Sequence, residues 1–563
     1  MKISKFRNVA FALITMFSIV SCGEIMKDLK YEVAPNPIEM HGNEITVNIN
    51  GEFIEKGLNS KVLVELTPVL VNPQGQELAF KMESFKGSKA AGNAKIIPST
   101  GMKFNYSSTK PYDPAFENSV LKVRYKAFKG STMKKEGITE SIADGVTVTP
   151  FLIQKDDKIM FAKANLVRST EKTMKAVINY DKAKSNIKDL EFDDKDITNF
   201  EDFLAGSASN SKIVWTSLKV FSYASPEGEM DKNSNLAVER AQSANAYLKR
   251  MSSNIGFTLK DGLIKTYPKG EDWNGMKELI SKSSHEDKDI IVRVAEMNSD
   301  PEKREAEIKT LSSTYTFLNK EIFPQLRRSQ LILTYVVNER TNEELLQQAY
   351  FKPQGLTIEE LVFIANNLIV KEDKKLSLYQ EIILKAPTEW RGFNNAGAIL
   401  YEQGKISEAK KMFEKAYKLN QNNVTSNNWG AMLRQDGKFT EAEELFSNGS
   451  GEETSYNMAL INIRKGKYGV ALNDMGANTF NKALAETLKK DYKTALTTIE
   501  NSADNNTAIG NYLKAIISVR TGDNLGAIAK LKDAIKQDSS LRAKAKKDRE
   551  FIKLFKLASF AGL

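Results

Sequence analysis

The chain has 563 residues, of which 41% are hydrophobic and 27% are charged. Its length predicts about three or four domains, and its apolar content is sufficient for a sizeable core in each. The formal net charge of +10 is spread over Lys-rich stretches and forms no basic arm, which argues against nucleic-acid binding. The only cysteine, Cys22, excludes an intrachain disulfide and a zinc site with paired thiolates.

The N-terminus has the pattern of a secretory signal. Three basic residues precede an apolar run at 9–20, which is shorter than the roughly 20 residues that a bilayer span needs. The run ends in Ile19-Val20-Ser21-Cys22, which resembles the lipobox of bacterial lipoproteins, in which the cysteine is acylated. The resemblance implies a signal peptide at 1–21, lipidation at Cys22 and a lipidated tether at 22–30. A plain signal peptide with a chance cysteine is the alternative.

Residues 31–155 alternate with the period of strands. Polar and apolar residues alternate at 44–49, and further strands are predicted at 62–71, 121–127 and 146–153. Short strands joined by turns such as 72–75 favour an all-β sandwich. His41 precedes a strand without a metal-binding partner nearby, so a surface position is expected.

Residues 160–338 mix the two periods. Strands are predicted at 174–178, 218–223, 264–267 and 330–337, with amphipathic helices at 236–250 and 304–318. This alternation predicts an α/β domain.

The α/β region also carries a motif. Ser222-Tyr223-Ala224-Ser225-Pro226-Glu227-Gly228 is followed by Asn233, Leu236, Arg240-Ala241 and Tyr247-Leu248. This resembles the OmpA-like peptidoglycan-binding domain, in the form of the motif that its Bacteroidota branch carries. The resemblance implies an OmpA-like fold and places a peptidoglycan-binding site at Ser225, Glu227, Gly228, Asn233 and Arg240.

This sequence departs from the family at one residue of the expected binding site. The family holds the diaminopimelate of the peptide stem with an aspartate and an arginine, and charge-assisted hydrogen bonds explain this choice. Arg240 fills the arginine position, but Ser225 fills the aspartate position and supplies no charge; Glu227 is a candidate substitute. The alternative is a structural or protein-binding module in which Arg240 pairs locally.

Residues 345–563 contain an internal repeat. Gly397, Gly404, Ala409 and Phe413 recur one unit later as Gly430, Gly437, Ala442 and Phe446, and the Gly–Ala pair returns at 466/471 and 522/527. Ala495 marks a degenerate unit. The spacing resembles the tetratricopeptide repeat (TPR), which implies an all-α TPR solenoid of stacked hairpins. A basic amphipathic stretch at 543–560 is predicted to be its capping helix.

The repeat family carries a partner groove. The matching positions here are Arg391, Asn394, Tyr401, Asn427 and Arg434, and ordinary solvated helix positions are the alternative for each.

The sequence favours binding over catalysis. Its two histidines, His41 and His285, lie in different regions, and it has neither a Gly-rich phosphate loop nor an H-E-x-x-H pair. No catalytic residue, cofactor or metal site is therefore predicted. The expected protein is a non-enzymatic outer-membrane lipoprotein, anchored by its lipid, that acts as a scaffold or adaptor.

Its TPR array would bind a protein partner of an envelope assembly or secretion system. The alternative function is a peptidoglycan-binding anchor that tethers the outer membrane to the cell wall. After Cys22 the acidic residues are sparse and Gly23 stands second, which favours the periplasmic face of the outer membrane over the cell surface.

Overall fold

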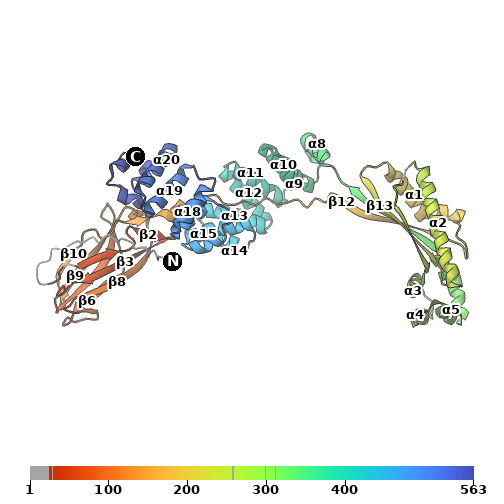
Figure 1. Cartoon of the computed structure of the whole chain (residues 1–563), viewed down its shortest axis with the longest axis horizontal. Helices are drawn as coiled ribbons and strands as arrows, with labels where there is room; N and C mark the ends of the chain where they lie inside the picture. The colour runs from red at the N-terminus through yellow and green to blue at the C-terminus, as the bar shows by residue number, and fades with distance from the viewer. Residues whose placement is uncertain (1–24, 28, 257–258, 298–299, 311) are drawn as a thin grey trace, which may run out of the picture. The chain divides into compact units, whose positions relative to one another are not determined.

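The computed structural model describes residues 25–27, 29–256, 259–297, 300–310 and 312–563 (Figure 1). Cys22 and the predicted signal peptide lie outside the described residues. Contacts divide the chain into two compact units. The described part of Met1–Ala162 groups with Lys371–Leu563 in the first unit, although the second unit, Lys163–Val370, lies between them in sequence.

The N-terminal part of the first unit is a β-sandwich. One sheet has the strand order β1-β3-β2-β11 with β8 on β3, and the other has the order β10-β9-β4-β6-β7 with β5 on β4. The first sheet consists of β1 (Leu29–Val33), β2 (Ile38–His41), β3 (Glu44–Phe53), β8 (Met102–Pro111) and β11 (Val146–Thr147). The second consists of β4 (Val62–Val71), β5 (Glu77–Ala79), β6 (Glu83–Gly87), β7 (Lys95–Ile97), β9 (Val120–Lys129) and β10 (Thr132–Ile138).

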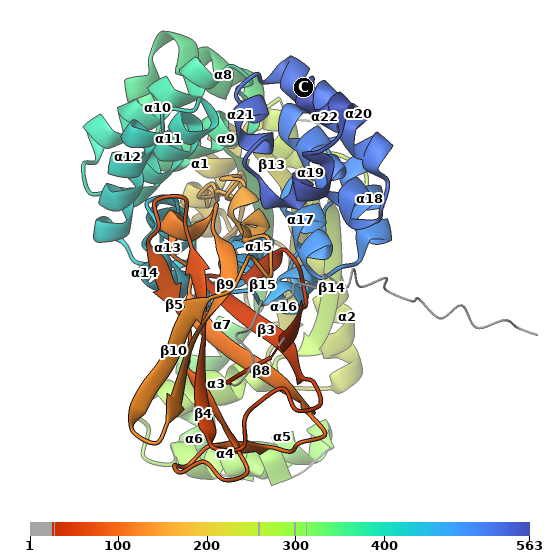
Figure 2. The same ribbon diagram turned by 90° about the vertical axis from the view of Figure 1, so that its left-hand side faces the viewer.

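The predicted alternation is what places the core between these two sheets. Ile45, Val47 and Ile49 of β3 are buried, while the residues between them are half-buried or exposed. The core also holds Phe53 of β3 and Phe85 of β6, whose ring centroids lie 5.3 Å apart. Figure 2 shows the strands β3, β4, β8 and β9 of the two sheets.

The predicted strand at 146–153 is wrong over most of its length. Only Val146–Thr147 forms a strand, β11, which pairs in parallel with β2. A short helix, η2 (Thr149–Leu152), follows it. The physical reason is Pro150, which has no N–H for a ladder and suits the first turn of a helix.

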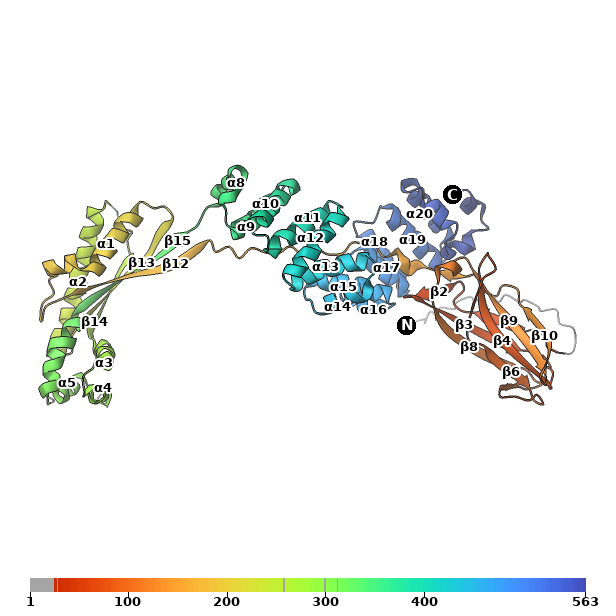
Figure 3. The same cartoon turned by 180° about the vertical axis from the view of Figure 1, so that it is seen from behind.

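The C-terminal part of the first unit is a stretch of helical hairpins consistent with a TPR-like solenoid (Figure 3). After α10 (Glu372–Lys385), the hairpins pair a first helix with a second one. They are α11 (Trp390–Glu402) with α12 (Ile406–Leu419), α13 (Asn423–Gln435) with α14 (Phe439–Ser447), α15 (Glu452–Arg464) with α16 (Tyr468–Asn473), α17 (Phe480–Leu488) with α18 (Tyr492–Glu500), and α19 (Ala508–Arg520) with α20 (Asn524–Gln537). We call these helices, together with the terminal segments that follow them, the helical array.

Small residues set the spacing within these hairpins, as the repeat predicts. A Cβ on Gly430 would lie 2.7 Å from the ring of Phe446, and one on Gly397 would lie 2.9 Å from that of Phe413. The repeated alanines, such as Ala409, are fully buried in the second helices. The turn glycines adopt positive φ, for example +72° at Gly404, a conformation that a glycine adopts without steric strain.

The C-terminus caps the array in three short pieces rather than one helix. They are α21 (Leu541–Ala545), η6 (Arg549–Leu554) and α22 (Ala558–Ala561). Phe551, Leu554 and Phe560 are buried in the same core as the last hairpins. The predicted cap is therefore present, but the single amphipathic helix at 543–560 is wrong.

The sandwich and the array pack directly on one another. Arg520 of α19 pairs with Glu550, and its guanidinium also lies 3.8 Å from Glu39 of β2. Glu550 in turn accepts a hydrogen bond from Thr149. At a second contact, the ring of the exposed His41 packs edge-to-face against the ring of Tyr468, with ring centroids 4.8 Å apart. The hydrogen bond from Thr149 to Glu550 therefore holds the start of residues 149–162 against the hairpins.

The second unit contains a four-stranded sheet with the order β12-β15-β13-β14. Its strands are β12 (Ser169–Asn179), β13 (Ile213–Ala224), β14 (Ile264–Glu271) and β15 (Arg328–Asn338). Its helical segments are η3 (Asp189–Asp193), α1 (Lys195–Ala208), α2 (Met230–Asn254), α3 (Trp273–Lys282), α4 (Lys288–Met297), α5 (Pro301–Thr310), α6 (Ser312–Phe317), η4 (Leu318–Ile322), α7 (Phe323–Leu326), α8 (Asn342–Phe351) and α9 (Ile358–Asn367). Buried residues of α1 and α2 share a core with those of β12, β13 and β15.

Candidate functional site

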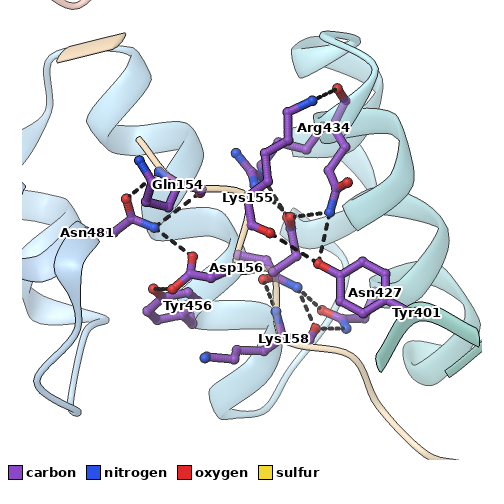
Figure 4. Close-up of polar contacts among 12 residues, drawn as sticks. Gln154, Lys155, Asp156, Lys158, Tyr401, Asn427, Arg434, Tyr456 and Asn481 are labelled. Atoms are coloured by element: carbon purple, nitrogen blue, oxygen red, sulfur yellow. Dashed lines mark hydrogen bonds and ion pairs between the residues drawn. The ribbon is translucent and has the colours of Figure 1, made fainter. Parts of the chain in front are cut away.

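An extended segment, residues 154–162, lies along the first helices of the hairpins (Figures 3 and 4). It has no helix or strand hydrogen bonds of its own, and Ile153 joins it to η2. Its main chain is bonded instead by side chains of α11, α13, α15 and α17. We call residues 154–162 the bound segment, and the side chains that hold it the segment-binding surface.

Four asparagines occupy equivalent positions in successive first helices, each two residues before a Gly or Ala. Each one accepts from the N–H and donates to the C=O of a single residue of the bound segment. The pairs are Asn395 with Ala162 (2.7 and 2.9 Å), Asn428 with Met160 (2.8 and 2.8 Å), Asn457 with Lys158 (2.8 and 2.8 Å) and Asn481 with Gln154 (2.8 and 3.2 Å). We call these four residues the asparagine row. It satisfies main-chain groups of an extended peptide that has no strand partner.

Two of the predicted groove residues form a second line beside this row. Asn394 donates to the carbonyl of Met160 at 3.0 Å, and Asn427 donates to that of Lys158 at 2.8 Å. Asn428 also donates to Asn394 at 2.9 Å, which links neighbouring hairpins through their side chains. Such a network holds each amide in one orientation.

Arg434 recognises an acidic side chain of the segment. Its guanidinium bonds both carboxylate oxygens of Asp157, at 2.5 and 2.6 Å, and Gln435 adds a bond at 2.9 Å. The side chain of Asp157 is 0% exposed and that of Arg434 only 6%. Burial alone would lower the pKa of Arg434, but its hydrogen bond to Asp157 and the charge of Asp157 raise the pKa above its ordinary value. The pair is thus a buried, bidentate ion pair.

Two tyrosines, both labelled in Figure 4, also bond the bound segment, and Asn481 donates to its Asp156 carboxylate at 2.6 Å. Tyr401 donates to the carbonyl of Lys155 at 3.4 Å, and burial together with the charge of Asp157 raises the pKa of Tyr401 to about 12. Tyr456 donates to the carboxylate of Asp156 at 2.5 Å. Burial raises the pKa of Asp156 above its ordinary value.

Apolar side chains of the bound segment pack between the hairpins. Ile159 and Phe161 are partly buried against a cluster that includes Leu400 and Phe413. The segment therefore presents Asp157 to a cation and the next two alternate residues, 159 and 161, to an apolar cluster.

The structure places the predicted groove residues as follows. Asn394, Tyr401, Asn427 and Arg434 all contact the bound segment, so what they bind here is the chain itself. Arg391 is ion-paired with Glu389 at 2.9 Å. Sequence reasoning missed the asparagine row, although its signal was present as an Asn recurring two residues before each small packing residue.

The predicted peptidoglycan site is closed by internal bonds. Arg240 is 0% exposed and donates to the carbonyls of Lys184, Tyr223 and Asp181 at 3.0, 2.8 and 3.2 Å. Its guanidinium lies 5.0 Å from the centre of the Tyr180 ring, and burial lowers its pKa to about 10. Arg240 therefore pairs locally with the main chain in this structure, which is the alternative that the sequence left open for it.

The loop before α2 is likewise internally paired. Ser225 donates to Glu227 at 2.8 Å, and Arg327 donates to the same carboxylate oxygen at 2.6 Å. Burial alone would raise the pKa of Glu227, but the bond from Ser225 and the charge of Arg327 hold it below its ordinary value. Asn233 donates to the carbonyl of Glu227 at 3.1 Å, and the N–H of Gly228 donates to Glu305 at 2.5 Å. This arrangement shapes the loop and turns its charges inward.

Within the described residues, no three histidine, cysteine or acidic side chains gather as a metal site would require. No helix in the described ranges combines the length and the apolar character of a membrane span.

Comparison with known proteins finds matches among solved structures. No protein-family model and no curated protein match the chain. Among solved structures it is similar to YrrB, described as a TPR protein with an unusual peptide-binding site, at 17% identity over 36% of this chain and 99% of that chain, with a TM-score of 0.21. Yeast Tom70 shares 12% identity over 66% of this chain and 93% of its own, with a TM-score of 0.24.

A tetratricopeptide repeat protein from Parabacteroides merdae shares 12% identity over 56% of this chain and 92% of its own, with a TM-score of 0.16. The repeat is defined by the hairpins, turn glycines and small packing residues described above.

Proposed function

We propose that this protein is a non-enzymatic scaffold in which the helical array binds an extended protein segment. The observation that supports this function is the asparagine row, which bonds the N–H and C=O of residues on an extended chain. An array of this kind holds a peptide by its backbone and leaves its covalent bonds untouched. The polar side chains of the segment-binding surface are used in hydrogen bonds and one ion pair, which suits holding rather than reaction.

The proposed location rests on the sequence. The resemblance of residues 19–22 to a lipobox supports a lipid anchor at Cys22, on the periplasmic face of the outer membrane. The proposed partner is a protein of an envelope assembly or secretion system.

The test compares variants in the native envelope. Asn428→Ala combined with Asn457→Ala removes the centre of the asparagine row, and Asn448→Ala is the matched control because its amide bonds only its own helix at 3.1 Å. Cross-linking followed by affinity purification should retrieve a discrete partner with the wild type and Asn448→Ala but not with the double variant. Equal retrieval by all three would refute the proposal, since the partner would then dock elsewhere.

The anchor is tested separately. Cys22→Ser should abolish incorporation of labelled palmitate and move the chain out of the membrane fraction. Continued membrane association without the label would refute lipid anchoring at Cys22.

The alternative, a peptidoglycan anchor, has less support. Arg240 is buried and Glu227 is paired with Arg327, so neither charge is free for a cell-wall peptide. Co-sedimentation of residues 23–563 with peptidoglycan sacculi is therefore expected to fail; retention that depends on Glu227 would restore this alternative.

A further inference from the structure

We propose that the bound segment is a replaceable ligand in cis, and that the external partner is an extended peptide of the same chemistry. That chemistry is a carboxylate at the position of Asp157 followed by apolar residues at the positions of Ile159 and Phe161. The inference rests on the proposed function, because it identifies what the helical array binds. It also means that a partner must displace residues 154–162.

Asn395, Asn428 and Asn457 of the asparagine row bond main-chain groups of the bound segment, whereas Asn481 also donates to the carboxylate of Asp156 at 2.6 Å. Every bond the row makes to Lys158, Met160 and Ala162 goes to a backbone N–H or C=O. Any extended peptide carries the same groups at the same two-residue spacing. The row therefore fixes the conformation of a ligand and places almost no demand on its sequence.

Selectivity comes from the residues between those contacts. Arg434 is buried and needs a carboxylate, because a buried guanidinium without its partner is strongly unfavourable. The cluster around Leu400 and Phe413 takes up apolar side chains at the next alternate positions, 159 and 161. An acidic residue followed by alternating apolar ones is thus the pattern this surface fits.

The bound segment has one advantage over a competitor, its covalent attachment. It has no helix or strand of its own, and the contacts that hold it are made by array side chains, so a free peptide of equal sequence would gain the same bonds. Attachment through a short connection gives an effective concentration on the order of millimolar. A free peptide is therefore expected to bind the wild-type chain only near that concentration, whereas an array relieved of its segment would bind it more tightly.

The experiment uses the chain 23–563 and a fluorescent peptide with the sequence of residues 154–162. Fluorescence anisotropy measures its Kd for the wild type and for a variant in which 154–162 is replaced by Gly and Ser residues of equal number. The replaced chain should bind at least tenfold more tightly than the wild type. A peptide carrying Asp157→Lys should bind the replaced chain at least tenfold more weakly than the unaltered peptide does. The unaltered peptide should likewise bind at least tenfold more weakly to a replaced chain that also carries Asn428→Ala and Asn457→Ala.

Equal binding by wild-type and replaced chains would overturn the inference. Where circular dichroism shows that the replaced chain does not fold, Asp157→Lys in the full chain loosens the segment at one side chain. It should then bind the peptide more tightly than the wild type does, and no gain would overturn the inference. A wild-type dimer that dissociates on segment replacement would also overturn it, by making a second copy the occupant.

The two proposals can fail separately. Peptide binding by the replaced chain, without a partner in the envelope that depends on the asparagine row, would sustain the exchangeable surface and refute the scaffold function. A partner in the envelope that depends on the asparagine row, without peptide exchange in solution, would sustain the scaffold function and refute the exchangeable surface.

Discussion

Replacing Asn428 by alanine tests whether the asparagine row holds the bound segment. The change removes two bonds to Met160, each 2.8 Å long, and two bonds to neighbouring asparagines, one donated to Asn394 at 2.9 Å and one accepted from Asn427 at 3.1 Å. A typical net contribution of about 1 kcal/mol per hydrogen bond gives about 4 kcal/mol. Met160 is half-buried and water can restore part of this, so about 1.5–3 kcal/mol is expected for local opening of the segment.

The assay is amide hydrogen exchange read by mass spectrometry over residues 154–162. Because each 1.4 kcal/mol corresponds to a factor of ten, exchange at Lys158 and Met160 should accelerate about 10- to 100-fold. Asn428→Asp is a second variant, which keeps an acceptor for the Met160 N–H but sets a carboxylate against its C=O; it should accelerate exchange to a similar degree. Asn448→Ala, whose exposed amide bonds its own helix, should change exchange by less than about twofold.

The reasoning would be refuted by one of two results. Unchanged exchange in the segment would mean that other contacts hold it without the row. An equal acceleration across the whole chain would mean that Asn428 acts on global stability and not on the segment.

Three further predictions concern stability, each followed by chemical or thermal unfolding of the chain 23–563. Arg240→Ala removes three hydrogen bonds from a buried guanidinium to backbone carbonyls and should lower the stability of the second unit by about 3 kcal/mol. Glu229→Ala, at an exposed site just before the same helix, should change the stability by less than about 0.5 kcal/mol, and similar losses for both variants would contradict the structural role of Arg240. Gly430→Ala places a Cβ 2.7 Å from Phe446 and should lower stability by about 1–3 kcal/mol, while Gly469→Ala, which meets nothing within 4 Å, should be neutral or stabilising; a harmless Gly430→Ala would show that Phe446 can shift. Burial, followed by the charge of Glu550, raises the pKa of the buried Asp548 from 3.8 to about 6. The ionised carboxylate therefore lowers the stability of the fold above pH 6, and this loss is relieved as the pH falls from 6 toward 4. Asp548→Asn should remove this gain in stability between pH 6 and pH 4, and an unaltered pH profile would show that Asp548 is not its source.

Local patterns in the sequence predicted much of the fold. The period-two alternation found β3 and β4, since a strand with one buried face must alternate. The repeated glycines found the hairpin turns, and the small residues opposite Phe413 and Phe446 explained how the helices approach. These features were readable because each depends on neighbours a few residues apart or on a repeat that recurs along the chain.

The errors also have physical reasons. The strand expected at 146–153 ended early at Pro150, and the terminal helix broke into pieces because its apolar residues fill the end of the last hairpins. The ligand-binding role that the motif implies for Arg240 stays a prediction, and in this structure its donors bond backbone carbonyls of neighbouring loops. A motif specifies a residue type, but burial decides whether that residue can reach a ligand.

What the sequence by itself determined is the order of β-sandwich, α/β and helical-hairpin regions, and four of the residues that line the segment-binding surface: Asn394, Tyr401, Asn427 and Arg434. What only the tertiary structure decided is the occupant of that surface. Residues 154–162 have no period, no turn chemistry and no strand partner nearby, so they read as a connection between domains. Their hydrogen-bonding partners, such as Asn428 and Asn457, lie hundreds of residues later in the chain. A pairing between an extended backbone and distant side chains leaves no trace in local sequence, because backbone groups are the same at every residue.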